Sequence, residues 1–159
     1  MKIIQDTREQ TPYIFRGYDT IIKKLLVADY SIQGMDNRIV IERKSLADAY
    51  GTIGKGRERF VKQLAIMSDY EYSAIVIESG ISDFILYPES FNKALLKRCK
   101  ANLTLDYDKL KMKMSPKAAV NSLFAWSICY GVHVFWCDNR EYGQATTLRL
   151  LEKFYKYKG

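Results

Sequence analysis

The stretch "RIVIERKSLAD", residues 38–48, combines a buried strand with charges that a buried strand does not need. Its residues 39–41, "IVI", are a β-branched run typical of a strand in the middle of a sheet. In an extended chain, side chains two positions apart share a face, so Glu42 and Lys44 point together while Arg43 points away. The stretch therefore predicts a central strand that ends in a paired carboxylate and ammonium.

The segment before it predicts the strand's partner. Residues 34–37, "GMDN", are turn formers between the apolar run that begins after Asp29 and the "IVI" strand. An antiparallel hairpin with this turn returns Glu42 to the neighbourhood of Asp29. The hairpin thus predicts two adjacent carboxylates at one end of the sheet.

Two further carboxylates are expected near this pair. "KIIQ" at residues 2–5 predicts a short buried strand that delivers Asp6, and Asp48 follows Lys44 by four positions. Two carboxylates about 4 Å apart repel by roughly 4 kcal/mol at an effective dielectric near 20. A cluster of this kind favours a bound cation, and ligands that are all oxygen suit Mg²⁺ or Mn²⁺.

A metal held by carboxylates with open positions can bind a phosphate and activate water, so the reaction class predicted is phosphodiester hydrolysis. Lys44 would position or help deprotonate that water, or stabilise the charge of the transition state. The alternative is a surface network in which Lys44 and Arg43 neutralise Glu42 and Asp48, each pair contributing about 0–1 kcal/mol.

Outside this region strands and helices alternate, which predicts an α/β fold: a mixed β-sheet with an antiparallel hairpin, flanked by helices. Helical periodicity or capping favours helices, and β-branched runs favour strands. The expected helices are residues 18–28, 57–69, 115–130 and 143–157, and the expected further strands are residues 72–79 and 131–137.

The 159 residues, 48% hydrophobic and 13% aromatic, suffice for one domain, and we expect residues 1–159 to form it. A formal net charge of +7 favours a polyanionic partner, with DNA the first expectation. No segment approaches the roughly 18 apolar residues of a membrane span. We therefore expect no membrane partner and a cytoplasmic protein that acts at DNA.

Positive charge concentrates in residues 93–117, where eight Lys or Arg face two Asp. This segment predicts either a solvated helical face or a phosphate-binding stripe or flexible arm. The glycine-rich residues 51–56, "GTIGKG", predict either a flexible loop that approaches DNA beside the active site or a plain solvent loop. The candidate DNA-binding residues are Lys55, Arg57, Lys97, Arg98 and Lys100.

The cysteines Cys99, Cys129 and Cys137 form no CxxC pair and lie in apolar stretches, so we expect reduced thiols in the core. Cys129, His133 and Cys137 would align on a helix as zinc ligands. Gly131 and the strand expected after it break that alignment, so the sequence favours structural roles.

Taken together, these motifs resemble the XPF/Hef-type (ERCC4-like) nuclease domain, a branch of the PD-(D/E)xK restriction-endonuclease-like superfamily. The signature of that domain, Gly-Asp followed by Glu-Arg-Lys-x-x-x-Asp, appears here with Ala28 in place of the glycine. Its early D-x-R-E motif and its helical Arg and Gln one turn apart are also present. The matching residues are Asp6, Arg8 and Glu9; Ala28 and Asp29; Glu42, Arg43, Lys44 and Asp48; and Arg59 and Gln63.

The resemblance implies a restriction-endonuclease-like sheet and divalent-metal-dependent DNA cleavage, on branched, repair, recombination or replication DNA. It implies Asp29, Glu42 and Asp6 as metal ligands and Lys44 as the catalytic cation. It also implies a homodimer, and replication or recombination proteins as partners. The supporting residues would be Arg8, Arg43, Asp48, Arg59 and Gln63.

Two departures from the family pattern matter. Ala28 should cost little unless the backbone there needs a positive φ. Relatives usually append a helix-hairpin-helix domain, and we expect none in this chain. The alternative function is a noncatalytic module for nucleic-acid binding or dimerisation that keeps the nuclease fold.

Overall fold

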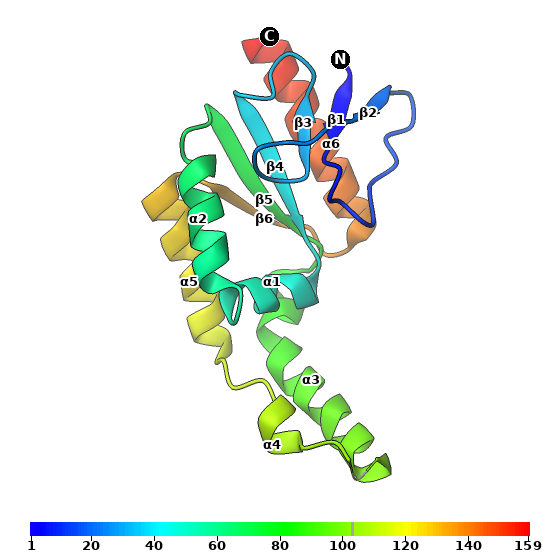
Figure 1. Ribbon diagram of the computed structural model, residues 1–159, viewed down its shortest axis with the longest axis vertical. Helices are drawn as coiled ribbons and strands as arrows, with labels where there is room; N and C mark the ends of the chain where they lie inside the picture. Colours follow the sequence, from blue (N-terminus) through cyan, green and yellow to red (C-terminus); the bar gives the residue numbers. More distant parts are fainter. Residues whose placement is uncertain (103) are drawn as a thin grey trace.

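The computed structural model describes residues 1–102 and 104–159, and a six-stranded mixed sheet lies at its centre (Figure 1). The strand order is β2-β1-β3-β4-β5-β6. β3 pairs antiparallel with both β1 and β4, and the other neighbouring pairs are parallel. The predicted class, a mixed sheet with an antiparallel hairpin flanked by helices, is confirmed. The strands are β1 (Ile3–Gln5), β2 (Thr20–Ile22), β3 (Tyr30–Ile32), β4 (Ile39–Lys44), β5 (Tyr72–Ile77) and β6 (His133–Trp136).

Helices cover both faces of this sheet, which is why β4 and β5 contain the continuous apolar runs 39–41 and 74–77. Among the described residues, no helix combines the length and the apolar character that a membrane span requires. The helices are α1 (Leu46–Ile53), α2 (Arg57–Met67), α3 (Ile81–Ala101), α4 (Tyr107–Leu110), α5 (Pro116–Tyr130) and α6 (Arg140–Lys158).

The pleat of β4 separates two buried clusters. Val40 packs in the cluster that includes Leu64 of α2 and Trp126 of α5. Ile41 packs in the other, with Leu151 of α6. Side chains alternate along a strand, so Glu42 and Lys44 point to the same face as Val40. This is the face that α1 and α2 cover.

The predicted helix over residues 18–28 is wrong. Thr20–Ile22 forms β2 instead, and Leu25 is buried while Leu26 is 72% exposed. The cause is tertiary: the N–H of Lys23 donates to the carbonyl of Gln5, and the N–H of Leu25 donates to the carboxylate of Asp6 at 2.6 Å. These bonds to β1 and its end replace the ones that a helix would supply.

Two other predictions need correction. The predicted loop of residues 51–56 begins later, because α1 extends through Gly51 to Ile53, with Ser45 capping it by accepting from the N–H of Asp48. Of the three predicted core thiols only Cys137 is buried; Cys99 is half-buried, and Cys129 is exposed on the outer side of α5.

The residue in the place of the signature glycine has an unusual backbone. Ala28 has a φ of +66°, in the left-handed region, and its side chain is buried. The positive φ that makes alanine costly in place of the signature glycine is therefore present at Ala28. Strain of about 1–2 kcal/mol is expected for an L-residue there.

We expect Ala28→Gly to change the free energy of unfolding by less than about 1 kcal/mol, because relief of strain is offset by the lost burial of a methyl group and the freer unfolded chain. Ala28→Val should destabilise by more than about 2 kcal/mol, since a β-branched residue fits poorly at positive φ. Urea denaturation of both variants measures this. A Val variant as stable as the parent chain would refute the strained backbone.

The α3–α4 arm, residues 81–102 and 104–114, projects beyond the end of the sheet where β4 and β5 finish (Figure 1). Both chain termini lie at the opposite end. The side-chain amide of Asn92 in α3 donates to the carbonyl of Met112 at 2.9 Å and accepts from its N–H at 2.7 Å. The outward helix is thereby tied to the returning chain.

Candidate active site

An open hollow lies where β4 ends, at the base of the arm. Its lining comes from three places: the loop after β1, the paired ends of β3 and β4, and the first turn of α1. The lining residues are Arg8, Glu9, Gln10, Thr11, Asp29, Glu42, Arg43, Lys44 and Asp48.

The hairpin brings the two central carboxylates together. Tyr30 is paired with Ile41, so Asp29 and Glu42 are the next opposing positions. The N–H of Asp29 donates to the carbonyl of Ile41 at 3.1 Å, and the N–H of Arg43 donates to the Asp29 carboxylate at 2.7 Å. The hairpin ladder thus sets the relative position of both acids.

Lys44 completes this group on the same face. Its Nζ lies 2.6 Å from Oε1 of Glu42 and 4.6 Å from the ring centroid of Phe60 on α2. Both side chains are shielded, with 14% of Lys44 and 7% of Glu42 exposed. One ammonium is therefore held against a carboxylate in a place of restricted solvent access.

The charge balance at Asp29 is unfavourable without a further cation. Burial, and next the negative charge of Glu42, raise the pKa of Asp29 to about 8, against a weaker lowering effect of the Arg43 N–H. Glu9 adds to the increase, so a third carboxylate acts on the same point. A cation bound here would relieve this repulsion.

Among residues 1–102 and 104–159, no three His, Cys, Asp or Glu side chains are placed to hold a metal by themselves. Four carboxylates line the hollow: Glu9, Asp29, Glu42 and Asp48. Asp29 and Glu42 are the pair that the hairpin places opposite each other, and both are hard oxygen ligands. This donor set fits Mg²⁺, which keeps several waters and is usually bound through one or two carboxylates.

Asp6 lies outside the lining. Its carboxylate accepts from the backbone N–H of Arg8 and of Leu25 and from the guanidinium of Arg8, the shortest bond being 2.6 Å. Burial opposes its ionisation, but these hydrogen bonds outweigh it and lower the pKa of Asp6. The backbone N–H of Asp6 donates to the carbonyl of Asp29 at 2.8 Å, so the two residues are neighbours. The carboxylate of Asp6, however, is bonded to Arg8 and Leu25 rather than lining the hollow, and its charge is already compensated.

Arg43 points to the other face, as the pleat predicts. Its guanidinium donates to both carboxylate oxygens of Glu78, at 2.7 and 2.8 Å, and to Oγ1 of Thr11 at 2.6 Å. The bond to Glu78 raises the pKa of Arg43. Arg43 therefore joins the ends of β4 and β5 to the loop that carries Arg8 and Glu9.

The remaining sequence candidates are spread out. Asp48 lines the hollow at its exposed edge, bonded to Ser45 at 2.6 Å. Arg57 donates to Ser122 and lies 5.1 Å from the ring centroid of Trp126, so it ties α2 to α5. The other candidates do not line the hollow. Lys55 and Arg59 are exposed and Gln63 is half-buried, in or just before α2. The candidates on the arm are Lys97, Arg98 and Lys100.

Sequence reasoning assigned no role to two carboxylates, Glu9 and Glu78. Glu9 belongs to the D-x-R-E motif, so the sequence did contain a pattern that indicates its position in the hollow. Glu78 follows the apolar run of β5 just as Glu42 follows that of β4, and this shared pattern could have predicted a charged residue beside the site.

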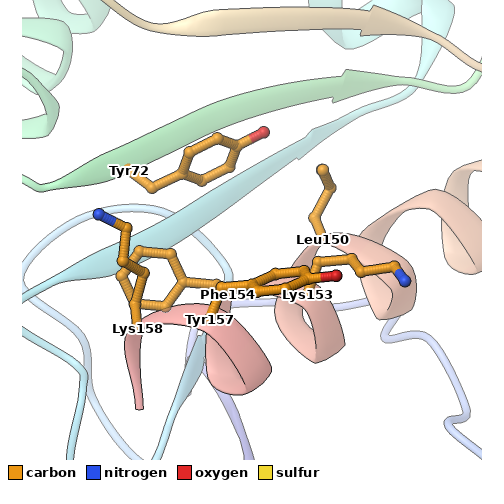
Figure 2. A pocket seen from close by; sticks show the side chains of 6 residues that line it. All are labelled: Tyr72, Leu150, Lys153, Phe154, Tyr157 and Lys158. Carbon is orange, nitrogen blue, oxygen red and sulfur yellow. The ribbon is translucent and has the colours of Figure 1, made fainter.

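A second hollow lies against α6, beside the start of β5 (Figure 2). It contains aromatic, aliphatic and lysine side chains rather than carboxylates. The lining residues are Tyr72, Leu150, Lys153, Phe154, Tyr157 and Lys158. Of these two hollows, the first is therefore the one with carboxylates that could hold a metal.

A mixed sheet with an acidic pair and a lysine at one strand end defines the class of restriction-endonuclease-like domains that the motifs suggested. The family model of the ERCC4 domain matches residues 5–150, so the chain belongs to the ERCC4 domain family. The resemblance inferred from the motifs is confirmed. None of the curated proteins compared with the chain matches its sequence significantly.

Two of the solved structures that share the fold are of an XPF. XPF from Aeropyrum pernix has a TM-score of 0.65 and 16% identity, and the alignment covers 99% of this chain and 66% of that one. XPF from Aeropyrum pernix in complex with DNA has a TM-score of 0.63 and 17% identity, with 98% and 64% covered. This chain thus spans slightly less than two thirds of the length of these relatives.

Proposed function

We propose that the chain is a divalent-metal-dependent DNA endonuclease that hydrolyses phosphodiester bonds, acting on branched, repair, recombination or replication DNA. The observation that carries the proposal is the pair Asp29 and Glu42 beside Lys44 in an open hollow. Membership of the ERCC4 domain family supports it, as does the fold shared with an XPF that was solved in complex with DNA.

The proposed metal ligands are Asp29 and Glu42, and the bound Mg²⁺ or Mn²⁺ would supply Lewis acidity toward a phosphate oxygen and a water. Lys44 would stabilise charge on the phosphate or orient the attacking water, because its ammonium lies on the same face as both acids. Asp6 would hold Arg8 at the rim of the hollow, where the guanidinium can meet a phosphate.

The test is an incubation of the purified chain with end-labelled single-stranded, duplex, flap, fork and four-way-junction DNA. Each substrate is tested with Mg²⁺, with Mn²⁺ and with chelator. Internal cuts that need the metal support the proposal, and the pattern of substrates cut identifies the preferred DNA structure.

The second candidate is a noncatalytic nucleic-acid-binding or dimerisation module. It is favoured by the ion pair in which the carboxylate of Glu42 already neutralises the ammonium of Lys44. Salt-sensitive DNA binding without cutting on any substrate or metal would select this candidate over the nuclease.

We further propose that residues 1–159 act as one nuclease domain at cytoplasmic DNA, with replication or recombination proteins as partners. A homodimer is proposed as well, because α5 exposes Phe124 at 46% and Ile128 at 83%. The mass in solution is expected to be that of two chains. A monomer at micromolar concentration would contradict the dimer and leave the nuclease proposal intact.

A further inference from the structure

We propose that the α3–α4 arm is a binding site for the sugar–phosphate backbone of duplex DNA and holds the duplex on one side of the active-site hollow. This inference rests on the proposed function, since it names the substrate form that the hollow would receive. It assigns the concentrated charge of residues 93–117 to phosphate contacts rather than to a solvated surface. Residue 103 of that segment is outside the described residues.

The arm carries more positive charge than its own acids compensate. Three of its seven cations are paired locally: Lys93 with Glu89 at 2.6 Å, and Lys109 and Lys111 with Asp106 and Asp108 at 3.4 and 2.7 Å. The other four form no ion pair with any described residue. They are Lys97, Arg98, Lys100 and Lys113.

The lysines of α3 form a stripe. Lys93, Lys97 and Lys100 recur at helical spacing and lie on the side opposite the buried Leu95. Their backbone positions span about 10 Å along the helix at a rise of 1.5 Å per residue. Since phosphates along one strand of a duplex are about 3.4 Å apart in axial rise, the stripe is long enough to follow roughly three of them.

The arm is fixed with respect to the hollow. At its base, the hydroxyl of Tyr50 in α1 donates to the carbonyl of Phe84 at 2.7 Å, and the rings of Tyr50 and Tyr87 are 5.2 Å apart. α1 is also the helix that places Asp48 at the edge of the hollow. Further along, Asn92 ties α3 to the return segment. A phosphate site on such a support has a defined distance to the reacting centre.

The reach of the arm beyond its base can be expressed in base pairs. Lys97 and Lys100 lie 10 and 13 positions beyond Tyr87, so about 15–20 Å further along α3. At about 3.4 Å per base pair this corresponds to contacts roughly four to six base pairs beyond the base of the arm, where Tyr87 packs on Tyr50 of α1. The arm should therefore extend the footprint on one side of the cut.

Duplex is favoured over single-stranded DNA because the stripe lacks stacking groups. Proteins that hold single strands stack bases on exposed aromatic rings. The outer segment at residues 93–101, "KALLKRCKA", has no aromatic residue. Tyr107 on α4 is half-buried, with Nζ of Lys111 5.6 Å from its ring centroid. Phosphate contact is the recognition that remains.

The test compares a variant carrying Lys97→Gln, Arg98→Gln and Lys100→Gln with a control carrying Lys2→Gln, Lys153→Gln and Lys156→Gln. The control loses the same charge at the far end of the sheet, near the termini. Affinity for a 10-bp and a 24-bp duplex, and for a 24-nucleotide single strand, is measured by fluorescence anisotropy in chelator over a series of salt concentrations.

We expect the arm variant to bind the 24-bp duplex at least about tenfold more weakly near 0.1 M salt, with the salt slope reduced by about 2–3, or 0.9 per lost phosphate contact. The control should stay within about twofold of the parent chain. The increase in affinity from the 10-bp to the 24-bp duplex should also be smaller in the arm variant than in the parent chain and the control.

An unchanged slope, or an equal loss in both variants, would overturn the arm as a specific site. A loss confined to the single strand would overturn the choice of duplex. Unfolding midpoints of both variants exclude a folding defect. Binding is measured without metal, so the result does not depend on cleavage. If the parent chain cut no DNA but the arm variant still showed the reduced salt slope, the proposed function would be refuted and the arm site would stand.

Discussion

Replacing Glu42 with Gln is expected to lower metal-dependent DNA cleavage by at least about a hundredfold while DNA binding in chelator stays within about twofold. The substitution keeps the size of a side chain that is 7% exposed but removes the charge that would hold the cation. Changes to groups that only support metal ligands already cost about 10–100-fold, so a ligand should cost at least as much. Initial rates on the best substrate, with Mg²⁺ and with Mn²⁺, measure the effect.

The matched control is Glu141→Gln, the same chemical change at an exposed position in the first turn of α6. Its cleavage rate should be unchanged. If Glu42→Gln cut DNA at the parental rate, the assignment of the hollow between β4 and α1 as the active site would fail, whatever activity the chain has.

Much of this site could be predicted because it depends on local rules. The period of two along β4 places Glu42 and Lys44 on one face, and the turn at residues 34–37 fixes the register that brings Asp29 opposite. Both rules act over fewer than twenty residues. The class of fold follows from the same periodicities, applied to the strands and helices that come later.

What could not be predicted depends on tertiary hydrogen bonds. Ile21, Ile22, Leu25 and Leu26 have helical spacing, yet the Asp6 carboxylate accepts from the Leu25 N–H and holds the segment extended. The same carboxylate also accepts from Arg8 and does not line the hollow. A carboxylate at a strand end has the same sequence pattern whether it binds a metal or fastens a loop.

The metal-free chain is expected to lose stability as pH rises from about 5 to about 8, because Asp29 titrates in the fold near pH 8. Its unfolded pKa is near 3.8, so between these values the folded chain holds a proton that the unfolded chain has released. Unfolding then releases a proton, and the stability falls by at most about 1.4 kcal/mol per pH unit. Above the folded pKa the dependence should level off.

Urea denaturation at pH 5, 6, 7 and 8 in chelator measures this dependence, and Asp29→Asn is the reference because it retains every other titratable group. The difference in slope between the two chains therefore isolates Asp29. Equal slopes would contradict a raised pKa and with it the crowding of charge beside Glu42.

Added Mg²⁺ should show whether the carboxylates that raise the pKa of Asp29 also bind a metal. A cation binds the ionised form, so at pH 5 it must displace the Asp29 proton and at pH 8 it need not. Stabilisation by millimolar Mg²⁺ should therefore grow from pH 5 to pH 8 in the parent chain and be absent in Asp29→Asn. If Mg²⁺ stabilised both chains equally, the raised pKa would belong to a structural carboxylate, and the metal would have to bind elsewhere.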